Sequence, residues 1–407
     1  MTLARPYIPR VSPRAAAQPQ VAADRRRQLW VWWREVDRVL LALVLLLMAI
    51  GWVAVAAASP ASAERLSARS VTLPELYFFW LHVRWQALGL LVMLATSILP
   101  VETARRGAIV LGGIVFMTLA LVPFLGTEVN GARRWLDLGI RFQPSEFLKP
   151  PFAIAVAWIL SWRLRDPDLP VIPITLGLLG VIVALVMAQP NLGSAILFVG
   201  CWFVIVLLAG LPVQRVAAFG GAGIVLLAAT YMFYDNARHR IDSFLGGGTA
   251  FDQVDLASRT LMAGGWTGAG LWLGTEKMRL PEAHTDYIFS VIGEEFGLLT
   301  CAVVVLLYLA IALRVLVRLL DEDRLFIILA ASGLMALFGG QAFINMMVNL
   351  QLFPSKGMTL PLVSYGGSST IAQCFLIGLL LAITRRNPFL AREKFDLAGA
   401  LTREDRR

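Results

Sequence analysis

The sequence is short of charged residues and of cysteine, and each shortage excludes a class of protein. Only 15% of its 407 residues are charged, whereas a soluble globular domain carries about 25%. Three cysteines in a chain of this length exclude a disulfide-rich secreted protein. Cys201, Cys301 and Cys374 each lie inside an apolar stretch away from any histidine, so we interpret them as small apolar residues of helices.

The abundant residues are hydrophobic. They make up 58% of the chain, and the mean hydropathy is +0.70, so there is more apolar surface than the fold of a soluble protein can cover. The sequence therefore predicts a protein whose solvent is lipid. The net charge of +9 does not indicate nucleic acid, because the basic residues lie at the ends and in the loops between apolar runs, as in membrane proteins.

Ten apolar runs of about twenty residues predict an all-α polytopic membrane protein with ten transmembrane helices. Helices are expected because lipid offers no hydrogen-bond partner to an open backbone. The eighth run is long enough to tilt or to extend beyond the bilayer. The predicted spans are 39–59, 79–99, 107–125, 145–162, 171–188, 192–210, 215–234, 287–316, 325–348 and 366–384.

The predicted orientation places both termini in the cytoplasm. When the helices alternate in direction, most of the 36 Lys and Arg residues fall on the side of the N-terminus. We expect residues 1–36 to form a disordered cytoplasmic arm without a removable signal peptide, 37–384 the helical domain, and 385–407 a cytoplasmic tail. The largest outer segment, 235–286, joins the seventh and eighth spans.

Basic residues in the outer loops oppose this charge rule. Arg133, Arg134 and Arg141 lie in one loop, and the outer segment 235–286 holds Arg238, Arg240, Arg259, Lys277 and Arg279. They favour an anion-binding surface suited to a phosphate at the membrane interface, and ordinary solvation of the loops is the alternative.

Three further residues near the first of these loops extend the candidate site. Trp135 either stacks on a sugar or anchors the loop at the membrane interface. Glu146 and Lys149 are three residues apart, so they share a helix face near the start of a span. Because a charge at membrane depth costs about 2.5–3.5 kcal/mol, the two side chains either line a polar cavity or pair with each other.

Asp286 stands at the foot of the eighth span and has two interpretations. Aspartate is a good helix cap, but Thr285 could cap the helix equally well, which leaves the Asp286 carboxylate for chemistry. Glu282, His284 and Asp286 alternate along the chain, so an extended segment would point them the same way. That pattern is compatible with a metal site, which three residues of one loop are insufficient to establish.

Two glycine-rich segments and one acidic pair complete the polar features. Glu294 and Glu295 lie inside the eighth span and are expected to belong to a fixed structural network. The run 264–270 is interpreted as close backbone packing at the lipid surface. Segment 356–369 predicts a re-entrant turn, which is tolerated at membrane depth only where it is buried or lines a cavity.

In these segments the sequence resembles the SEDS family (shape, elongation, division and sporulation), over about residues 37–390. The resemblance rests on ordered motifs: NGARRWLDLG, FQPSEFLKP, PNLGS, RHRIDSFL, PEAHTDYIF, GEEFG and KGMTLPLVSYGGSS. Lys356 and Thr359 in the last motif, together with the long arm, resemble the division-type members more than the elongation-type members. The chain departs from the family at Asn191, where an aspartate is usual, so no catalytic carboxylate is expected there.

The resemblance implies a peptidoglycan glycosyltransferase that polymerises lipid II at the outer face of the cytoplasmic membrane. It implies that Asp286 is the essential aspartate and that the buried glutamate of the family is Glu294 or Glu295. No tightly bound cofactor is implied, and a divalent cation, Mg²⁺ or Mn²⁺, is compatible with the chemistry. The residues expected to bind substrate are Arg133, Arg134, Trp135, Lys149, Arg240, Gln253, His284, Lys356 and Ser368.

The implied partners are a class B penicillin-binding protein that acts as transpeptidase, other division proteins and membrane lipid. Three alternatives remain open from the sequence. A lipid II flippase would use charges inside the spans as a translocation path. An elongation-type polymerase would perform the same chemistry elsewhere in the cell. A scaffold would only recruit and activate its transpeptidase.

Overall fold

The computed structural model describes residues 29–386, apart from 68–71, 130–131, 138, 140, 165, 167, 356 and most of 211–252. One compact unit runs from Arg38 to Thr384, and it contains everything discussed below. Most of the predicted arm and tail and most of the seventh predicted span lie outside the described residues. Arg240 and Lys356 lie outside them as well.

Nine of the ten predicted spans correspond to helices in the described part of the chain. Most of their ends lie within three residues of the predicted ends. Two ends differ more, since α2 continues to Leu66 and α4 begins at Val101. The helices are α2 (Arg38–Leu66), α3 (Tyr77–Ile98), α4 (Val101–Leu125), α5 (Pro144–Ser161), α6 (Val171–Met187), α7 (Leu192–Leu208), α11 (Ile288–Leu319), α12 (Leu325–Asn349) and α13 (Gly367–Ile383).

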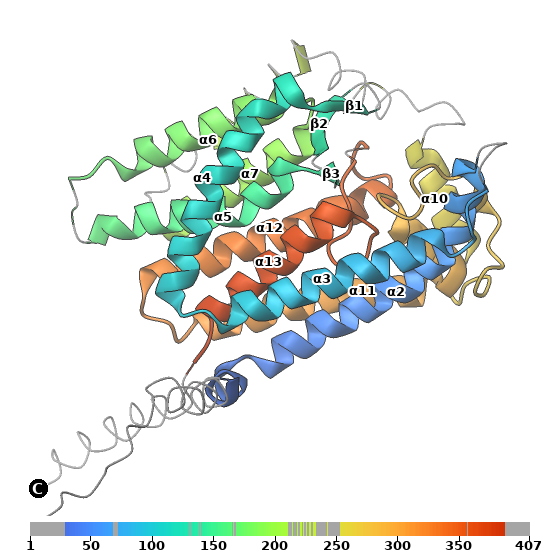
Figure 1. Cartoon of the computed structure of the whole chain (residues 1–407), viewed down its shortest axis with the longest axis horizontal. Helices are drawn as coiled ribbons and strands as arrows, with labels where there is room; N and C mark the ends of the chain where they lie inside the picture. The colour runs from blue at the N-terminus through green and yellow to red at the C-terminus, as the bar shows by residue number, and fades with distance from the viewer. Residues whose placement is uncertain are drawn as a thin grey trace, which may run out of the picture. The chain divides into compact units, whose positions relative to one another are not determined.

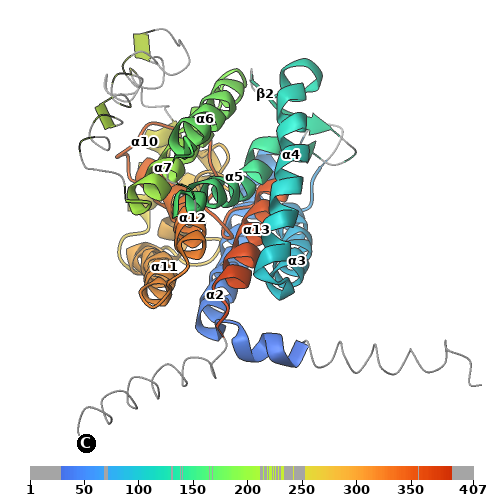
Figure 2. The ribbon, with the colours of Figure 1, turned by 90° about the vertical axis from the view of Figure 1, so that its left-hand side faces the viewer.

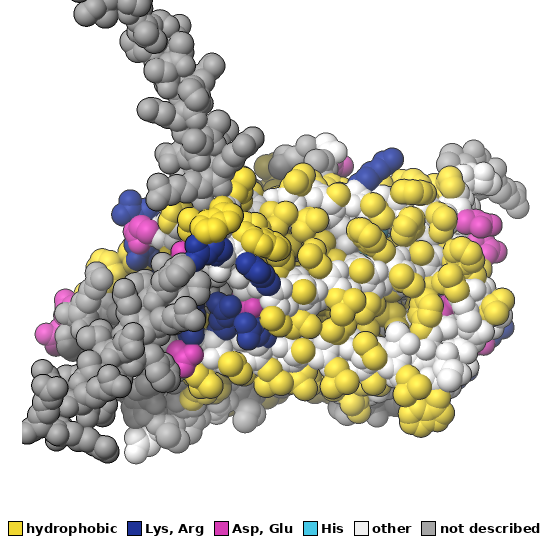
Figure 3. Space-filling view, turned by 90° about the horizontal axis from the view of Figure 1, so that it is seen from below, with side chains coloured by type: hydrophobic (Ala, Val, Ile, Leu, Met, Phe, Trp, Pro, Cys, Tyr) yellow, Lys and Arg dark blue, Asp and Glu magenta, His cyan; other side chains and the backbone are white. Residues whose placement is uncertain are grey.

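The composition of these helices is that of a membrane protein. Among the described residues, α2, α3, α4, α11 and α12 are long and apolar enough to cross a bilayer, and α6, α7 and α13 are shorter apolar helices. Figure 3 shows one face of the molecule, where hydrophobic side chains cover the broad middle and charged side chains gather toward the ends. The chain is therefore a polytopic helical membrane protein.

A small antiparallel sheet corrects the all-α prediction. It follows α4 and consists of β1 (Thr127–Val129), β2 (Ala132–Asp137) and β3 (Arg141–Phe142), in the order β1-β2-β3. Thr127 pairs with Trp135, and Leu136 pairs with Phe142. The strands were missed because β1 and β3 have only three and two residues and the six residues of β2, ARRWLD, do not alternate between apolar and polar types.

The core of the helical unit is formed by α12 and α13. α13 packs along α3, and α12 packs against α5, α7 and α11, so that these two helices lie among the others (Figure 2). All but a few side chains of α13 are buried. A helix that is apolar on every side suits such an enclosed position.

The non-helical segments collect at one end of the bundle, which we call the loop end. The sheet, α10 (Gln253–Ala263) and the segment before α13 lie at this end (Figure 1). At this end, hydrogen bonds link α2 and the segment before α13 to the turn that precedes α11. Ser62 near the end of α2 bonds to His284, 2.8 Å away, and Tyr365 N–H donates to the carbonyl of His284, 2.9 Å away. The loop end is where residues far apart in sequence meet.

Candidate active site

Asp286 lies in a turn that two side chains of α12 hold through its backbone carbonyl. The side chain of Asn345 donates to the carbonyl of Asp286 over 2.8 Å, and the side chain of Asn349 donates to the same oxygen over 3.2 Å. The N-cap residue of α11 is Tyr287, so Asp286 lies one residue before the cap position. Thr285 donates to Glu282. The two capping interpretations from the sequence are therefore not what the structure shows.

A small pocket opens beside Asp286. Its walls come from the turn before α11, from the last turns of α12 and from the segment after α12. The lining residues are Asp286, Tyr287, Asn345, Val348, Gly357 and Met358. A carboxylate, a carboxamide and apolar side chains therefore share one concave surface at the loop end.

Arg134 approaches this pocket at Gly357. A methyl group built on Gly357 would lie 3.6 Å from Oδ2 of Asp286 and 3.9 Å from Nη1 of Arg134. The Asp286 carboxylate and the Arg134 guanidinium therefore flank the same small space. The φ angle of Gly357 is +64°, which favours glycine, so the backbone passes close to both charges without a side chain between them.

Gly357→Ala is expected to reduce activity about tenfold or more, because the new methyl group would stand between Asp286 and Arg134. The matched control is Gly210→Ala. Gly210 has φ of +79° with nothing within 4 Å of an added methyl, so it reports the backbone strain alone. Polymer yield and thermal stability measured on both variants separate the two effects. Equal activity losses in the two variants would contradict the role of this space.

The two arginines of β2 have different partners. Nε of Arg134 donates to the carbonyl of Gln189 over 3.1 Å, and Nη2 donates to the carbonyl of Pro190, which ties β2 to the turn between α6 and α7. The pairing of β2 with β1 is irregular at this point, since Trp135 pairs with Thr127 and Arg133 with Glu128, which leaves Arg134 as the extra residue. Arg133 is exposed and pairs with Glu128 over 3.4 Å. The structure brings the Arg134 guanidinium close to Asp286 at Gly357.

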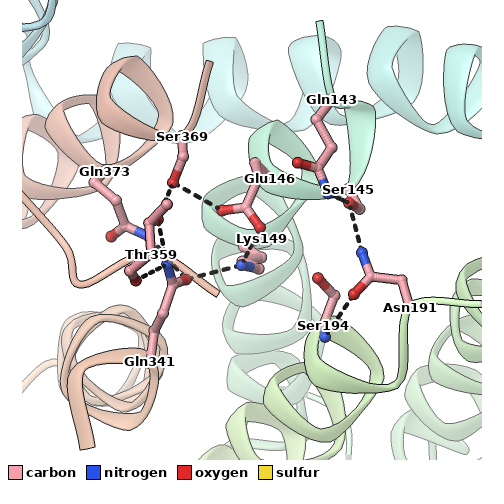
Figure 4. Close-up of polar contacts among 10 residues, drawn as sticks. All are labelled: Gln143, Ser145, Glu146, Lys149, Asn191, Ser194, Gln341, Thr359, Ser369 and Gln373. Atoms are coloured by element: carbon pink, nitrogen blue, oxygen red, sulfur yellow. Dashed lines mark hydrogen bonds and ion pairs between the residues drawn. The ribbon is translucent and has the colours of Figure 1, made fainter. Parts of the chain in front are cut away.

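Lys149 and Glu146 form a buried ion pair inside a polar network (Figure 4). Their charged atoms are 2.6 Å apart, and Lys149 also donates to Gln341 over 2.8 Å. Gln341 accepts a bond from Gln373 and donates to the carbonyl of Thr359. The network joins α5, α12 and α13 to the segment before α13. Lys149 is fully buried within it, whereas the sequence placed this cation against the substrate.

Asn191, where the chain departs from the family, has a structural role. The side chain of Asn191 accepts a hydrogen bond from the N–H of Ser194 over 3.2 Å, which caps the start of α7. Its amide nitrogen lies 3.4 Å from Oγ of Ser145 (Figure 4).

Glu294 and Glu295 belong to a fixed network at the other side of the loop end. Nζ of Lys277 donates to Glu295 and, over 3.0 Å, to the carbonyl of Ala57. Glu294 accepts the N–H groups of residues 276 and 277 and so holds the start of the short helix η2 (Glu276–Arg279). The network interpretation matches this arrangement. Lys277, which the sequence analysis counted among the basic residues of the outer surface, is instead buried and pairs with Glu295.

The glycine-rich run packs directly on α11. A methyl group on Gly264 would lie 2.0 Å from the carbonyl oxygen of Gly293, so no larger residue fits. The N–H groups of Ala269 and Gly270 donate to the carbonyls of Glu294 and Glu295. Close backbone contact, as expected from the sequence, therefore fixes this segment against the helix.

His284 is buried among aromatic rings. Its Nδ1 lies 2.8 Å from Oγ of Ser62, and its ring centroid lies 4.2 Å from that of Phe78 and 5.4 Å from that of Tyr365. Among the described residues, no three His, Cys, Asp or Glu side chains gather as metal ligands, so the metal interpretation of residues 282, 284 and 286 finds no support in their arrangement. Burial lowers the pKa of His284 from 6.5 to about 4.

This pKa predicts how stability depends on pH. The unfolded chain binds a proton at residue 284 below pH 6.5 and the folded chain only below about 4, so stability falls as the pH drops from 6.5 to 4. The loss amounts to about 3 kcal/mol, since a pKa difference of one equals roughly 1.4 kcal/mol. His284→Gln should flatten this part of the profile in thermal unfolding scans. An unchanged slope in the variant would contradict the assignment.

Two of the remaining expected residues lie within the described part. Gln253 begins α10, and its Oε1 accepts a bond from the hydroxyl of Tyr287 over 3.4 Å, so it is linked to the residue after Asp286. Ser368 is buried at the start of α13, and among the described residues its hydroxyl has no hydrogen-bond partner.

Sequence reasoning missed three carboxamides of α12. Gln341, Asn345 and Asn349 are four residues apart, so they lie along one face of the helix, and all three are buried. Their spacing within an apolar run was the available signal. Amides in such a run remain only where they have partners, and these hold the walls of the pocket.

The fold and this site define a polytopic membrane protein in which a carboxylate and a guanidinium lie close together at one end of a helical bundle. The family model for the FtsW, RodA and SpoVE cell cycle proteins matches residues 37–388, so the chain belongs to this family. Two relatives, from Caulobacter vibrioides and Methylococcus capsulatus, are each named probable peptidoglycan glycosyltransferase FtsW. Each is 36% identical, over 90% and 86% of this chain and 94% and 89% of the relatives.

Solved structures of related proteins share the fold. A chain of a peptidoglycan synthase complex that coordinates polymerisation and crosslinking superposes with a TM-score of 0.69 at 28% identity. The rod shape determining protein RodA of Thermus thermophilus superposes with a TM-score of 0.63, also at 28% identity. Both comparisons cover 86% of this chain and 97% of the other.

Proposed function

We propose that the protein is a peptidoglycan glycosyltransferase that polymerises lipid II at the outer face of the cytoplasmic membrane during septal synthesis. The observation that carries the proposal is the pocket lined by Asp286, beside which the Asp286 carboxylate and the Arg134 guanidinium both lie within 4 Å of one point next to Gly357. A base beside a cation suits a glycosyl transfer whose leaving group is a pyrophosphate. The names of the two 36% identical relatives support the same activity.

Helix lengths support a pocket at the level of lipid headgroups. Lys277 contacts both Ala57 on α2 and Glu295 on α11. Ala57 is nineteen positions from Arg38 at the opposite end of α2, which corresponds to about 28 Å. The hydrocarbon core of a bilayer is about 30 Å thick, so this level marks one boundary when Arg38 marks the other.

In this proposal the pocket lies near that boundary, at the loop end. Asp286 precedes α11, whose first part is separated from the rest of the helix by a kink at Gly297. The headgroup region on each side of the core is about 5–8 Å deep. With the loop end outside, as the positive-inside rule favours, a lipid-linked pyrophosphate would meet the pocket from the membrane, and both termini would be cytoplasmic.

The mechanism is a single displacement. The Asp286 carboxylate accepts the proton of the 4-hydroxyl of the acceptor GlcNAc, and that oxygen attacks C1 of the donor MurNAc. The bond between C1 and the pyrophosphate oxygen breaks, undecaprenyl pyrophosphate leaves, and the α linkage becomes β. Arg134 stabilises the charge of the leaving pyrophosphate. Lys149 acts on the framework through Glu146 and Gln341, since its ammonium is buried between them.

A divalent cation is compatible with this chemistry, but the described residues do not form a site for one. They offer no group of three acidic, histidine or cysteine ligands, and Asp286 is the carboxylate that they bring to the pocket. The steps above therefore use the side chains of this chain alone.

The proposal includes a partner. A class B penicillin-binding protein would crosslink the strands that this protein makes, as expected from the resemblance and in keeping with the synthase complex that shares the fold. The relatives named FtsW favour the division-type enzyme, and hence other division proteins at the septum, over the elongation-type enzyme.

The test is an assay of labelled lipid II with the full-length protein and its transpeptidase partner, beside an identically prepared Asp286→Ala complex. Polymer from the first preparation and none from the second supports the proposal and controls for contaminating polymerases. Movement of labelled lipid across liposomes without polymer would instead identify a flippase. Neither activity, with the transpeptidase still stimulated, would identify a scaffold.

A further inference from the structure

The side chain of Asn345 bridges two separate segments of the pocket wall. Its amide nitrogen lies 2.8 Å from the carbonyl oxygen of Asp286 and 2.6 Å from the carbonyl oxygen of Met358. A carboxamide nitrogen has two hydrogens, so both bonds can form at once. At these points neither segment belongs to a helix or strand, so the two carbonyls depend on such a partner inside the protein.

Asn349 supports the bridge from the next turn of α12. Its amide nitrogen donates to the carbonyl of Asp286, 3.2 Å away, and its Oδ1 accepts the N–H and the hydroxyl of Ser290 over 3.1 and 2.7 Å. Asn349 thereby holds the first turn of α11, which has no side-chain bond from its own N-cap residue. The two asparagines fix the main chain of Asp286 and leave the direction of its carboxylate to the pocket.

The bridge sets the distance across the pocket. Met358 is the neighbour of Gly357, over which Asp286 and Arg134 approach each other. If the segment of Met358 moved relative to the Asp286 turn, the space between base and cation would change. Gln341, one turn earlier on α12, continues the same fastening by donating to the carbonyl of Thr359 over 3.0 Å.

We propose that Asn345 is a positioning residue, which fixes the Asp286 carboxylate relative to the 357–359 segment and Arg134 so that base and leaving-group cation act on one substrate. The proposal rests on the proposed function. It assigns no contact with the substrate to Asn345, because both of its amide hydrogens are used by backbone carbonyls. Its effect should fall on the catalytic step more than on substrate binding, because misplacement of a reacting group lowers the rate within the bound complex.

The test is the isosteric variant Asn345→Asp, assayed with lipid II in the complex with the transpeptidase. The ionised carboxylate cannot donate to either carbonyl, so kcat should fall by about a hundredfold while KM stays within about threefold. When protonated, the introduced carboxyl group can donate one of the two bonds. The activity of the variant relative to the wild type should therefore rise as the pH falls. Asp286 and Arg134 are the charged side chains that the described residues bring to this pocket, and both remain in the variant.

The matched control is Gln373→Glu, the same change of amide to acid at a buried position on α13. Gln373 bonds to Gln341 and contributes nothing to the pocket lining. It should lower thermal stability without a pH-dependent change in relative activity. If Asn345→Asp does not fold, Asn345→Ser, whose hydroxyl can donate one bond, replaces it and should give an intermediate loss of kcat.

Equal losses of activity and stability in Asn345→Asp and Gln373→Glu, with the same pH profile, would overturn the proposal and leave Asn345 a structural residue. Full activity of Asn345→Asp would overturn it as well. Asp286→Asn, assayed in the same preparations, distinguishes a failure of the proposed function, since full activity in that variant would remove the base whatever Asn345 does.

Discussion

Asp286→Asn is expected to reduce the rate of lipid II polymerisation by about 10²–10⁴. General-base catalysis contributes a factor of this size, and an amide cannot accept the proton of the attacking hydroxyl. The fold should survive, because the carbonyl of Asp286, to which Asn345 and Asn349 donate, is kept in the variant. Initial rates of glycan formation at saturating lipid II are the measurement.

Two controls accompany this variant. Its thermal unfolding temperature should stay close to that of the wild type, and it should still assemble with the transpeptidase, so that loss of activity cannot be ascribed to misfolding. Asp255→Asn is a matched acid-to-amide change on α10. Asp255 pairs with Arg259, 2.9 Å away, and is not among the residues that line the pocket. It should keep near-normal rates. An Asp286→Asn enzyme that polymerises as fast as Asp255→Asn would exclude Asp286 as the base.

Lys277→Met is expected to destabilise the protein by about 3–5 kcal/mol. Lys277 and Glu295 form an ion pair whose side chains are 2% and 0% exposed, and removal of the cation leaves a buried carboxylate with no compensating charge. The double variant Lys277→Met, Glu295→Gln should recover much of the loss, because it removes both charges. Denaturant unfolding in detergent micelles measures the three free energies.

The control for this pair lies on α4. Arg106 and Glu102 are 2.8 Å apart but largely exposed, so Arg106→Met should cost no more than about 1 kcal/mol. A Lys277→Met variant that is no less stable than Arg106→Met would show that water reaches the Lys277–Glu295 pair and that the network is not enclosed.

The helices could be predicted from the sequence because long apolar runs have few alternatives in lipid. The end of α2 shows the limit of that argument. The sequence predicted an end at 59, but the helix continues through Pro60 to Leu66, because residues of this last part, such as Ala61 and Ala63, are buried against the loop end. Hydropathy locates the membrane segment of a helix and not its last turn.

The site could be predicted only one segment at a time. Asp286 and Arg134 were recognised by their residue types and by resemblance, but no pattern in a single sequence states that they share a pocket across Gly357. Lys149 was assigned to the substrate by resemblance, with a pair with Glu146 as the alternative that its spacing allowed, and the structure shows that pair. Its second partner, Gln341, lies in a different apolar run, so no local spacing reveals it. Asn345 and Asn349 were missed because the carbonyls to which they donate, those of Asp286 and Met358, belong to other segments of the chain.

The pocket also determines when the protein can become active during its synthesis. Its lining includes Asp286, Asn345 and Gly357, and Arg134 lies beside it, so the first of these residues emerges from the ribosome long before the last. Contacts between such distant segments form late, after the intervening helices have been inserted and packed. A nascent chain that has not yet inserted α12 contains Asp286 but lacks the amides that orient it, so the chain stays inactive until its final third reaches the membrane.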